Sequence, residues 1–254
     1  MTGSIDPNVI YSQNGPVFAL QMHRPEKKNA LTQTMYRALA EGLRYADAEA
    51  SIKVIVIQGT AECFTSGNDV NDFVVTTDGQ SERPSVQFMK AICHARKPVI
   101  AAVNGLAIGI GTTMLLHCDL AYASTDSYLQ LPFSRLGLCP EAGSSYLAPL
   151  LMGHQRAAEL LLLGERFSAL TAKEYGLVNR VLPNGEVLAY AMQKAQELGA
   201  LPGDAVQTTK QLLKRAQQGQ VDGTITVELE QFARLLQTSE AQAIMLAFLN
   251  RKKG

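Results

Sequence analysis

The sequence predicts an α/β fold in which strands and helices alternate over most of the chain and a helical region follows. Two apolar runs, residues 54–58 and 99–103, are rich in β-branched side chains, as is typical of buried strands. Segments with helical periodicity lie between such runs. The 254 residues are 46% hydrophobic and 18% charged, so the chain is long enough to bury a large core. We expect a core region over residues 1–195 and a helical region over residues 196–254.

The first part of the chain opens with a predicted hairpin. Asn14 and Gly15 form a pair that is typical of tight turns between antiparallel strands. Asn29 or Thr32 can cap the first helix through its side-chain oxygen. The elements expected up to residue 103 are strands at 9–11, 17–22, 54–58 and 99–103, and helices at 31–46 and 86–95.

After residue 103 we expect a Gly-rich turn over residues 104–111, and then further alternation. The predicted strands are 120–123, 128–131, 167–170 and 178–182, and the predicted helices are 112–118, 146–152, 154–163 and 172–175. Four helical patterns without a convincing strand between them end the chain, at 186–198, 204–217, 224–236 and 240–250. The last but one has an apolar face that exceeds what a solvated helix needs, so we expect it to pack on a neighbour. That face consists of Ile225, Leu229, Phe232 and Leu236.

Composition argues against several classes of function. The formal net charge is +0, which gives no electrostatic case for binding nucleic acid or an anionic membrane. The four cysteines and four histidines have neither a C-x-x-C nor an H-E-x-x-H spacing, so we expect no disulfide frame and no metal site. The N-terminus lacks the pattern of a signal peptide, and no apolar run is long enough to span a membrane. The C-terminus has no peroxisomal tripeptide, so we expect a cytoplasmic protein of bacterial type.

The Gly-rich turn at 104–111 follows a buried strand and precedes a helical segment. Gly109 and Gly111 fit part of a dinucleotide-binding fingerprint, but Met114 occupies the position of its third glycine and no phosphate-loop lysine follows. Both nucleotide interpretations are therefore rejected. Two remain open: an oxyanion hole, in which a backbone N–H faces a developing negative oxygen, and a structural turn that needs small residues.

Two other loops contain small and polar residues, at 65–70 and 139–146. The second contains Glu141 among apolar and small neighbours, where desolvation would raise its proton affinity and suit it to general-base catalysis. Alternatively, Glu141 complements the dipole of the helix that follows. Asp69 and Asp72 are rival acids in a more polar loop, and Asp119 is expected to make a structural hydrogen bond.

Several motifs together resemble the crotonase (enoyl-CoA hydratase/isomerase) superfamily, and the resemblance covers nearly the whole chain. The motifs are HRPEKKNAL (23–31), CFTSGNDV (63–70), KPVIAAVNGLAIGIG (97–111), CDLAYAS (118–124) and the register of small residues at 168–176. The resemblance implies a spiral of strand–strand–helix repeats. It also implies that the C-terminal helices assemble a homotrimer or a dimer of trimers.

The same resemblance implies which residues bind an acyl-CoA thioester. The backbone N–H groups of Asn68 and Ile110 would form the oxyanion hole. No cofactor is implied, because coenzyme A is part of the substrate. The other residues implied in substrate binding are Lys28, Ala30, Leu31, Ser66, Gly67, Asp69, Val70, Gly109 and Phe133, with Phe73 and Tyr146 as further candidates for the wall of the acyl pocket.

Departures from the hydratase pattern suggest the reaction. Hydratases of this family hold the attacking water with two glutamates, and Thr113 and Phe133 stand at those positions here. The remaining acid, Glu141, matches the catalytic base of the peroxisomal-type Δ3,Δ2-enoyl-CoA isomerases. The resemblance therefore implies transfer of a proton from C2 to C4 of a 3-enoyl-CoA, as in fatty-acid β-oxidation. An isomerase of CoA esters from aromatic degradation and a catalytically silent acyl-CoA-binding protein remain as alternatives.

Overall fold

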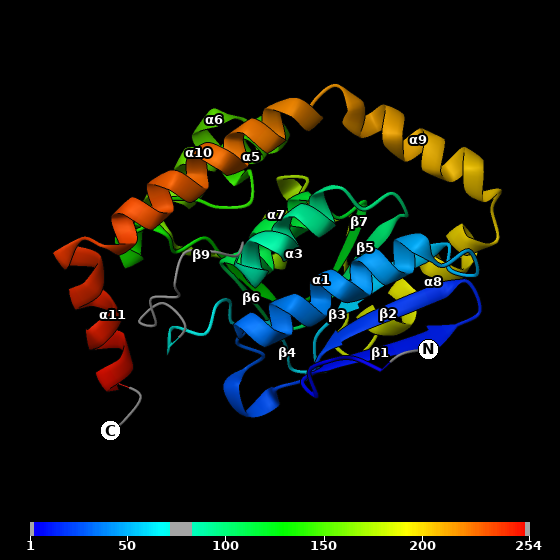
Figure 1. Ribbon diagram of the computed structural model, residues 1–254, viewed down its shortest axis with the longest axis horizontal. Helices are drawn as coiled ribbons and strands as arrows, with labels where there is room; N and C mark the ends of the chain where they lie inside the picture. Colours follow the sequence, from blue (N-terminus) through cyan, green and yellow to red (C-terminus); the bar gives the residue numbers. More distant parts are fainter. Residues whose placement is uncertain (1–2, 72–82, 252–254) are drawn as a thin grey trace.

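A computed structural model of the chain describes residues 3–71 and 83–251, and it contains two sheets surrounded by helices (Figure 1). The first sheet has six strands in the order β1-β2-β3-β5-β7-β10. Strands β1 and β2 are antiparallel, and the other neighbouring pairs are parallel. The strands are β1 (Val9–Asn14), β2 (Val17–Met22), β3 (Val54–Gln58), β5 (Val99–Val103), β7 (Leu120–Ser124) and β10 (Arg180–Leu182). The predicted strands of this sheet are therefore confirmed.

A second, smaller sheet has the strand order β4-β6-β8-β9. Its strands are β4 (Cys63–Thr65), β6 (Leu106–Ile108), β8 (Tyr128–Gln130) and β9 (Arg166–Ser168). Strands β4 and β6 were not predicted from the sequence, and the turn expected over residues 104–111 is wrong because β6 lies inside it. Each of these strands has only three residues, which is too short for a period of two to stand out beside glycines.

The two sheets grow together in a spiral, which confirms the architecture that the family resemblance implies. Successive pairs of strands, β3 with β4, β5 with β6 and β7 with β8, place their first member in the large sheet and their second member in the small one. A helical segment then leads to the next pair. Each turn of the spiral therefore adds one parallel strand to each sheet.

Helices account for most of the remaining chain, and most of the predicted ones are present with shifted ends. Their bounds are α1 (Gln33–Ala48), α3 (Pro84–Cys93), α4 (Ile110–Thr113), α5 (Ser144–Met152), α6 (His154–Ala158), α7 (Ala169–Glu174), α8 (Val187–Gly199), α9 (Gly203–Arg215), α10 (Gln218–Leu236) and α11 (Ser239–Arg251). Short 3-10 segments are η1 (Pro25–Lys27), η2 (Met114–Leu116) and η3 (Ser134–Leu136), and η4 (Glu159–Leu163) is a π-helical turn. The helix predicted at 112–118 is wrong in form, since α4 gives way to η2 after one turn.

The first helix shows how local chemistry sets a boundary. The Thr32 side chain accepts a hydrogen bond from the N–H of Met35, so Thr32 caps α1. Asn29, the alternative cap, instead donates to the carbonyl oxygens of Cys63 and Phe64 and accepts from the N–H of Arg24. Asn29 thus joins two distant segments near the small sheet.

The large sheet is buried on both faces, which explains why its strands are continuously apolar. One face packs in the core cluster that includes α1 and α3, and the opposite face packs on α8 through Val187, Ala191 and Ala195. The boundary expected after residue 195 falls within α8, and the division into two regions stays a prediction.

The helices after α8 form an arc along one side of the molecule, and α10 contacts α5 (Figure 1). The apolar face of α10 packs within the same chain, with Ile225 against the Tyr146 region and Leu236 in the main core.

The ammonium of Lys210 on α9 is buried and donates to the Asp119 carboxylate at 2.6 Å and to the Lys97 carbonyl at 2.8 Å. Asp119 also accepts from the N–H of Val99, which confirms its structural role. In the part of the chain that the structure describes, no helix is long and apolar enough to cross a membrane.

Candidate active site

Three loops leave the small sheet at one edge, because β4, β6 and β8 are neighbouring parallel strands. The loop after β4 carries Asn68, the turn after β6 carries Ile110, and the long loop after β8 carries Glu141. Carboxyl ends of parallel strands lie at a common edge, and such edges are frequent ligand sites. The fold therefore directs the three loops singled out by sequence to the same side of one sheet.

The backbone of Asn68 is oriented by its neighbours. The Gly67 carbonyl accepts a hydrogen bond from the N–H of Leu31, and the N–H of Asp69 donates to the carbonyl of Leu31, both at 2.9 Å. In this parallel bridge, the N–H of the intervening Asn68 points away from Leu31. Among the described residues it has no hydrogen-bond acceptor, while the Asn68 side chain accepts from the Tyr36 hydroxyl. This N–H is free for a ligand.

The turn after β6 presents a second free N–H. Gly109 has φ 57° and ψ −117°, a conformation for glycine alone, and it precedes α4. Its N–H donates to the Gln130 carbonyl of β8, whereas the N–H of Ile110, at the start of α4, donates to no acceptor within the described part of the chain. A Cβ on Gly67 would lie 2.8 Å from the Ile108 carbonyl oxygen, so the two loops approach at backbone distance.

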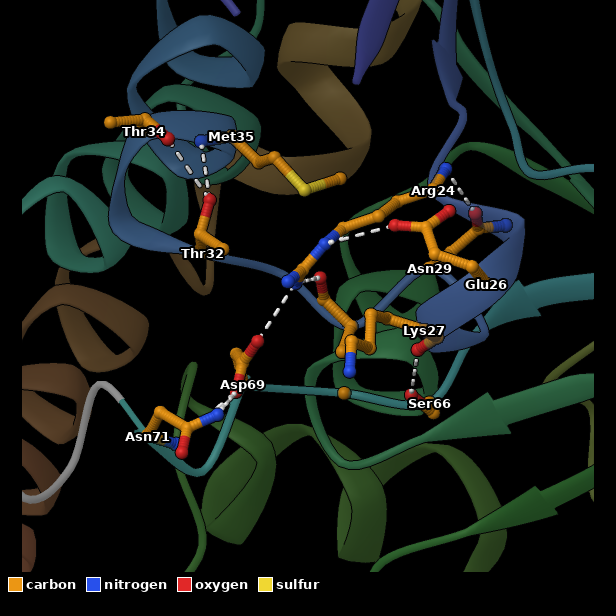
Figure 2. A network of polar contacts seen from close by, with 12 residues as sticks. Arg24, Glu26, Lys27, Asn29, Thr32, Thr34, Met35, Ser66, Asp69 and Asn71 are labelled. Atoms are coloured by element: carbon orange, nitrogen blue, oxygen red, sulfur yellow. Dashed lines mark hydrogen bonds and ion pairs between the residues drawn. The ribbon is translucent and has the colours of Figure 1, made fainter. Parts of the chain in front are cut away.

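The loop after β4 is fastened to residues 24–31, a segment that includes Lys28, Ala30 and Leu31, which are expected to bind substrate (Figure 2). The Arg24 guanidinium donates to the Asp69 carboxylate at 2.8 Å and to the Ala30 carbonyl at 3.0 Å. Asp69 is mostly buried, yet hydrogen bonds from Arg24 and Asn71 outweigh desolvation and hold its pKa below the ordinary value. Asp69 is therefore a structural acid, and its role in the loop makes it a poor proton acceptor.

The other residues expected to bind substrate lie in this paired segment. Lys28 and Asn29 both have left-handed backbones, with φ 51° and 53°. The Lys28 side chain is exposed, and its carbonyl accepts from the N–H of Ser66 at 2.9 Å. Ala30 and Leu31 are buried, and the backbone N–H and C=O groups of both already pair within the protein. Val70 is half-buried against the core.

Glu141 is the acid with the most unusual surroundings. Its side chain is 4% exposed, and its Oε1 has no hydrogen-bond partner in the described structure. Burial, with a smaller contribution from the charge of Glu228, raises its pKa to about 8. Glu141 is therefore desolvated, and its raised pKa would suit proton transfer near neutral pH; its catalytic role stays a prediction.

The backbone around Glu141 is unusual as well. Ala142 and Gly143 both have positive φ, 59° and 72°, and α5 begins directly after them. The His117 ring donates from Nε2 to the Ala142 carbonyl at 2.6 Å, and burial lowers the pKa of His117 to about 4. The imidazole is therefore neutral and fixes the loop as a hydrogen-bond donor.

One acid that was not singled out from the sequence also contacts this loop. Glu228 on α10 is buried and accepts hydrogen bonds from the N–H of Gly143 and from the N–H and hydroxyl of Ser145. The sequence feature that could have identified Glu228 is its position on the apolar face of α10, three residues after Ile225 and four before Phe232. A glutamate at such a position has to find partners inside the protein.

At the two positions where hydratases are expected to carry glutamates, this chain has a threonine without a hydrogen-bond partner among the described residues and a phenylalanine. Thr113 is fully buried, and its hydroxyl has no partner among the described residues. Phe133 lies three residues after the end of β8 and is buried in the main core. Tyr146 packs beside Val221 rather than with Phe133. Asp72 and Phe73 lie outside the described residues.

A group of metal-ligating atoms lies apart from these loops, where α3 ends against α10. Cys93, His94 and Asp222 each offer one ligand atom, and these atoms lie within 4.8 Å of one another. The Gln218 amide contacts all three side chains at 3.3–3.4 Å, and His94 pairs with Asp222 at 3.0 Å. The cluster is therefore already internally hydrogen-bonded and joins α10 to the core.

The comparisons with known proteins agree on the family, and the relatives include both isomerases and hydratases. Residues 12–254 match the enoyl-CoA hydratase/isomerase family. Rat enoyl-CoA delta isomerase 2 is 29% identical over 250 residues, which cover 96% of this chain but 64% of the rat protein, so the chain spans under two thirds of that relative. The 2,3-dehydroadipyl-CoA hydratase of Escherichia coli K12 is 32% identical over 96% of both chains. The solved structure of Pseudomonas aeruginosa OdaA superposes with a TM-score of 0.93 at 40% identity, covering 96% of this chain and 99% of that one.

Proposed function

Because this chain belongs to the enoyl-CoA hydratase/isomerase family of the crotonase superfamily, we propose that it is an enoyl-CoA isomerase. In this proposal the substrate is a 3-enoyl-CoA and the product is the 2-trans-enoyl-CoA. The observation that supports it best is Glu141, a buried carboxyl with a free oxygen and a raised pKa. A single base suffices for an isomerase, because the same proton leaves one carbon and returns to another.

The proposed reaction begins when the ionised Glu141 carboxylate takes a proton from C2 of the substrate. The electrons of the C2–H bond shift toward the thioester oxygen and form a dienolate. The free N–H groups of Asn68 and Ile110 would stabilise that negative oxygen. One such donor typically lowers the barrier by about 3 kcal/mol. Glu141 then returns the proton to C4, the double bond moves to C2–C3, and the carboxylate is restored.

The protein environment suits this chemistry in two further ways. Hydrogen bonds with Leu31 and Gln130 hold the two donor loops, so their N–H groups are oriented before the substrate binds. Asp69, the nearby acid, is paired with Arg24 and has a lowered pKa, so it does not compete with Glu141 as a base. No cofactor is needed in this scheme, since coenzyme A arrives as part of the substrate.

Hydration of a 2-enoyl-CoA is the second candidate, favoured by the similarity to the E. coli hydratase. It requires groups that hold and deprotonate a water molecule. The buried Thr113 and Phe133 stand where the family resemblance implies two glutamates, and neither can act as a general base at neutral pH. Glu141 alone would have to activate the water and protonate the carbon. We therefore favour isomerisation.

The variant Glu141→Gln tests the proposal, since it keeps the size of the side chain and removes the base. We expect isomerisation of 3-hexenoyl-CoA by the purified variant to fall by about 10²- to 10⁴-fold, the usual contribution of a general base. Glu230→Gln is the matched control, because it removes one negative charge from an exposed position of α10. Its rate should equal that of the wild type.

A parallel assay with 2-hexenoyl-CoA in water separates the two candidates. Isomerase activity that vanishes in Glu141→Gln, with little hydration in either protein, would support the proposal. An active Glu141→Gln enzyme would exclude Glu141 as the base. Rapid hydration by the wild type, without isomerisation of the 3-enoyl substrate, would favour the hydratase.

A further inference from the structure

We propose that Glu228 on α10 is a positioning residue for Glu141, which makes the C-terminal helical region a working part of the active site. The proposal rests on the proposed function of Glu141 as the base. Glu228 itself touches neither substrate nor reacting atoms in this scheme. It acts on the loop that carries Glu141, through both geometry and charge.

The geometric part is a clamp made by one carboxylate on two backbone N–H groups. Oε2 of Glu228 accepts from the N–H of Gly143 at 2.6 Å, and Oε1 accepts from the N–H of Ser145 at 2.8 Å and from its hydroxyl at 2.6 Å. These partners lie two and four residues after Glu141. Glu228 is 6% exposed, so the contacts form away from bulk water, where they are strong.

The clamp acts on a loop whose backbone has an uncommon conformation. Ala142 has φ 59°, in the left-handed region that is uncommon for a residue with a side chain. The first N–H groups of α5 have no acceptor within the helix, and the N-cap residue, Gly143, has no side chain to cap it. The N–H of Ser144 donates to the Glu141 carbonyl, and Glu228, more than 80 residues away, accepts from the N–H groups of Gly143 and Ser145. His117 holds the same loop from another side, through the Ala142 carbonyl.

The electrostatic part of the proposal follows from the repulsion between two negative charges, those of the Glu228 and Glu141 carboxylates. The Glu228 carboxylate disfavours a second negative charge on Glu141 and adds to the rise in its pKa that burial produces. Burial raises the pKa of Glu228 itself, and the hydrogen bonds from Ser145 and Gly143 oppose that rise by favouring the ionised form. Other titratable groups at this loop include Cys139, whose pKa is raised, and His117, which is neutral. The Lys214 ammonium donates to the His117 carbonyl. Removal of the Glu228 charge should therefore make Glu141 a weaker base.

The test compares Glu228→Gln with Glu230→Gln, which makes the same charge change on the exposed face of α10. An amide cannot accept from both N–H groups, so the loop should lose its fixed position, and misplacement of about 1 Å can lower a rate by about 10²-fold. We expect Glu228→Gln to lower kcat by at least tenfold with KM within about threefold. We also expect the acidic limb of its pH–rate profile to move to lower pH. Glu230→Gln should match the wild type in both.

Two further variants separate geometry from charge. Glu228→Asp keeps the charge but withdraws the carboxylate, and Ser145→Ala removes one of its three donors. Both should lower kcat while the acidic limb stays in place, with the larger effect in Glu228→Asp. If Glu228→Gln does not fold, these two variants still test whether Glu228 positions the Glu141 loop. A kcat within twofold of the wild type in Glu228→Asp, or an unmoved acidic limb in a folded Glu228→Gln, would overturn the proposal.

A direct titration distinguishes failure of this inference from failure of the proposed function. Carbon-13 NMR of glutamate-labelled protein follows each carboxyl, and the signal lost in Glu141→Gln identifies that of Glu141. A lower midpoint of this signal in Glu228→Gln, with no change in Glu230→Gln, supports the inference without reference to turnover. An unchanged midpoint contradicts it even if Glu141→Gln is inactive.

Discussion

At the scale of single residues, the burial of Glu141 decides how the protein should respond to pH. Its pKa of about 8 means that most molecules carry a protonated Glu141 at pH 7. Only the ionised form can accept a proton from C2. We therefore expect kcat/KM for 3-hexenoyl-CoA to rise with pH and to level off above about pH 8, with a rate at pH 6 about 10²-fold below the plateau. A profile that is already flat at pH 6 would contradict the assignment of Glu141 as the base.

The same shift predicts how stability depends on pH. The ordinary pKa of a glutamate, 4.5, applies to the unfolded chain, and the folded value is higher. Folding therefore favours the protonated form, so this contribution is fully present below pH 4.5 and is lost as pH rises through about 8, at about 1.4 kcal/mol per pH unit at most. We expect Glu141→Gln to be more stable than the wild type at pH 9 and no more stable at pH 5. Denaturant unfolding at both pH values measures this difference.

At the scale of elements, the approach of two loops depends on a glycine. Gly67 has φ 90°, and an added Cβ would lie 2.8 Å from the Ile108 carbonyl oxygen of β6. We expect Gly67→Ala to push apart the loops that carry the N–H groups of Asn68 and Ile110. Loss of one oxyanion donor typically costs about 10²- to 10³-fold in kcat, and we expect a fall of that order.

Gly185→Ala is the matched control for this substitution. Gly185 also has a positive φ, 84°, but among the described residues no atom lies within 4 Å of the position that its Cβ would occupy. The backbone strain is therefore similar in the two variants, and the collision is absent from the control. Its activity should stay near that of the wild type, whatever happens to its melting temperature. Equal losses of activity in the two variants would show that strain, and not the spacing of the loops, is responsible.

The elements also show what sequence could and could not predict. Strands such as Val54–Gln58 and Val99–Val103 are found at their predicted ends, because both of their faces are buried and their apolar runs are continuous. The three-residue strands β4 and β6 were missed, because pairing between distant segments creates them rather than local preference. The loop that carries Glu141 is contacted by Glu228 of α10, far along the chain, so the sequence could identify Glu141 but not its pKa.

At the scale of the whole molecule, the helical region has two sides with different properties. Its inner side is fastened to the core by Lys210 and Glu228, each buried and hydrogen-bonded to distant segments. Its outer side exposes large apolar side chains, with Leu212 62% and Leu213 74% exposed on α9. Apolar side chains left in water on one face of a tethered helix are typical of an interface between subunits. This agrees with the expectation of a trimer, which remains a prediction.

We expect Leu213→Asp to weaken that assembly, because a carboxylate in an apolar contact must be desolvated without a partner. Sedimentation should then change from the mass of three or six chains to that of one, while circular dichroism stays the same. Leu162→Asp provides the comparison, because Leu162 is similarly exposed, at 71%, but lies on η4 in the core region. If only Leu162→Asp dissociates, the interface belongs to the spiral rather than to the helical region. Since α9 also holds His117 through Lys214, loss of assembly in Leu213→Asp should be accompanied by a fall in isomerase activity if subunit contacts help to hold the Glu141 loop.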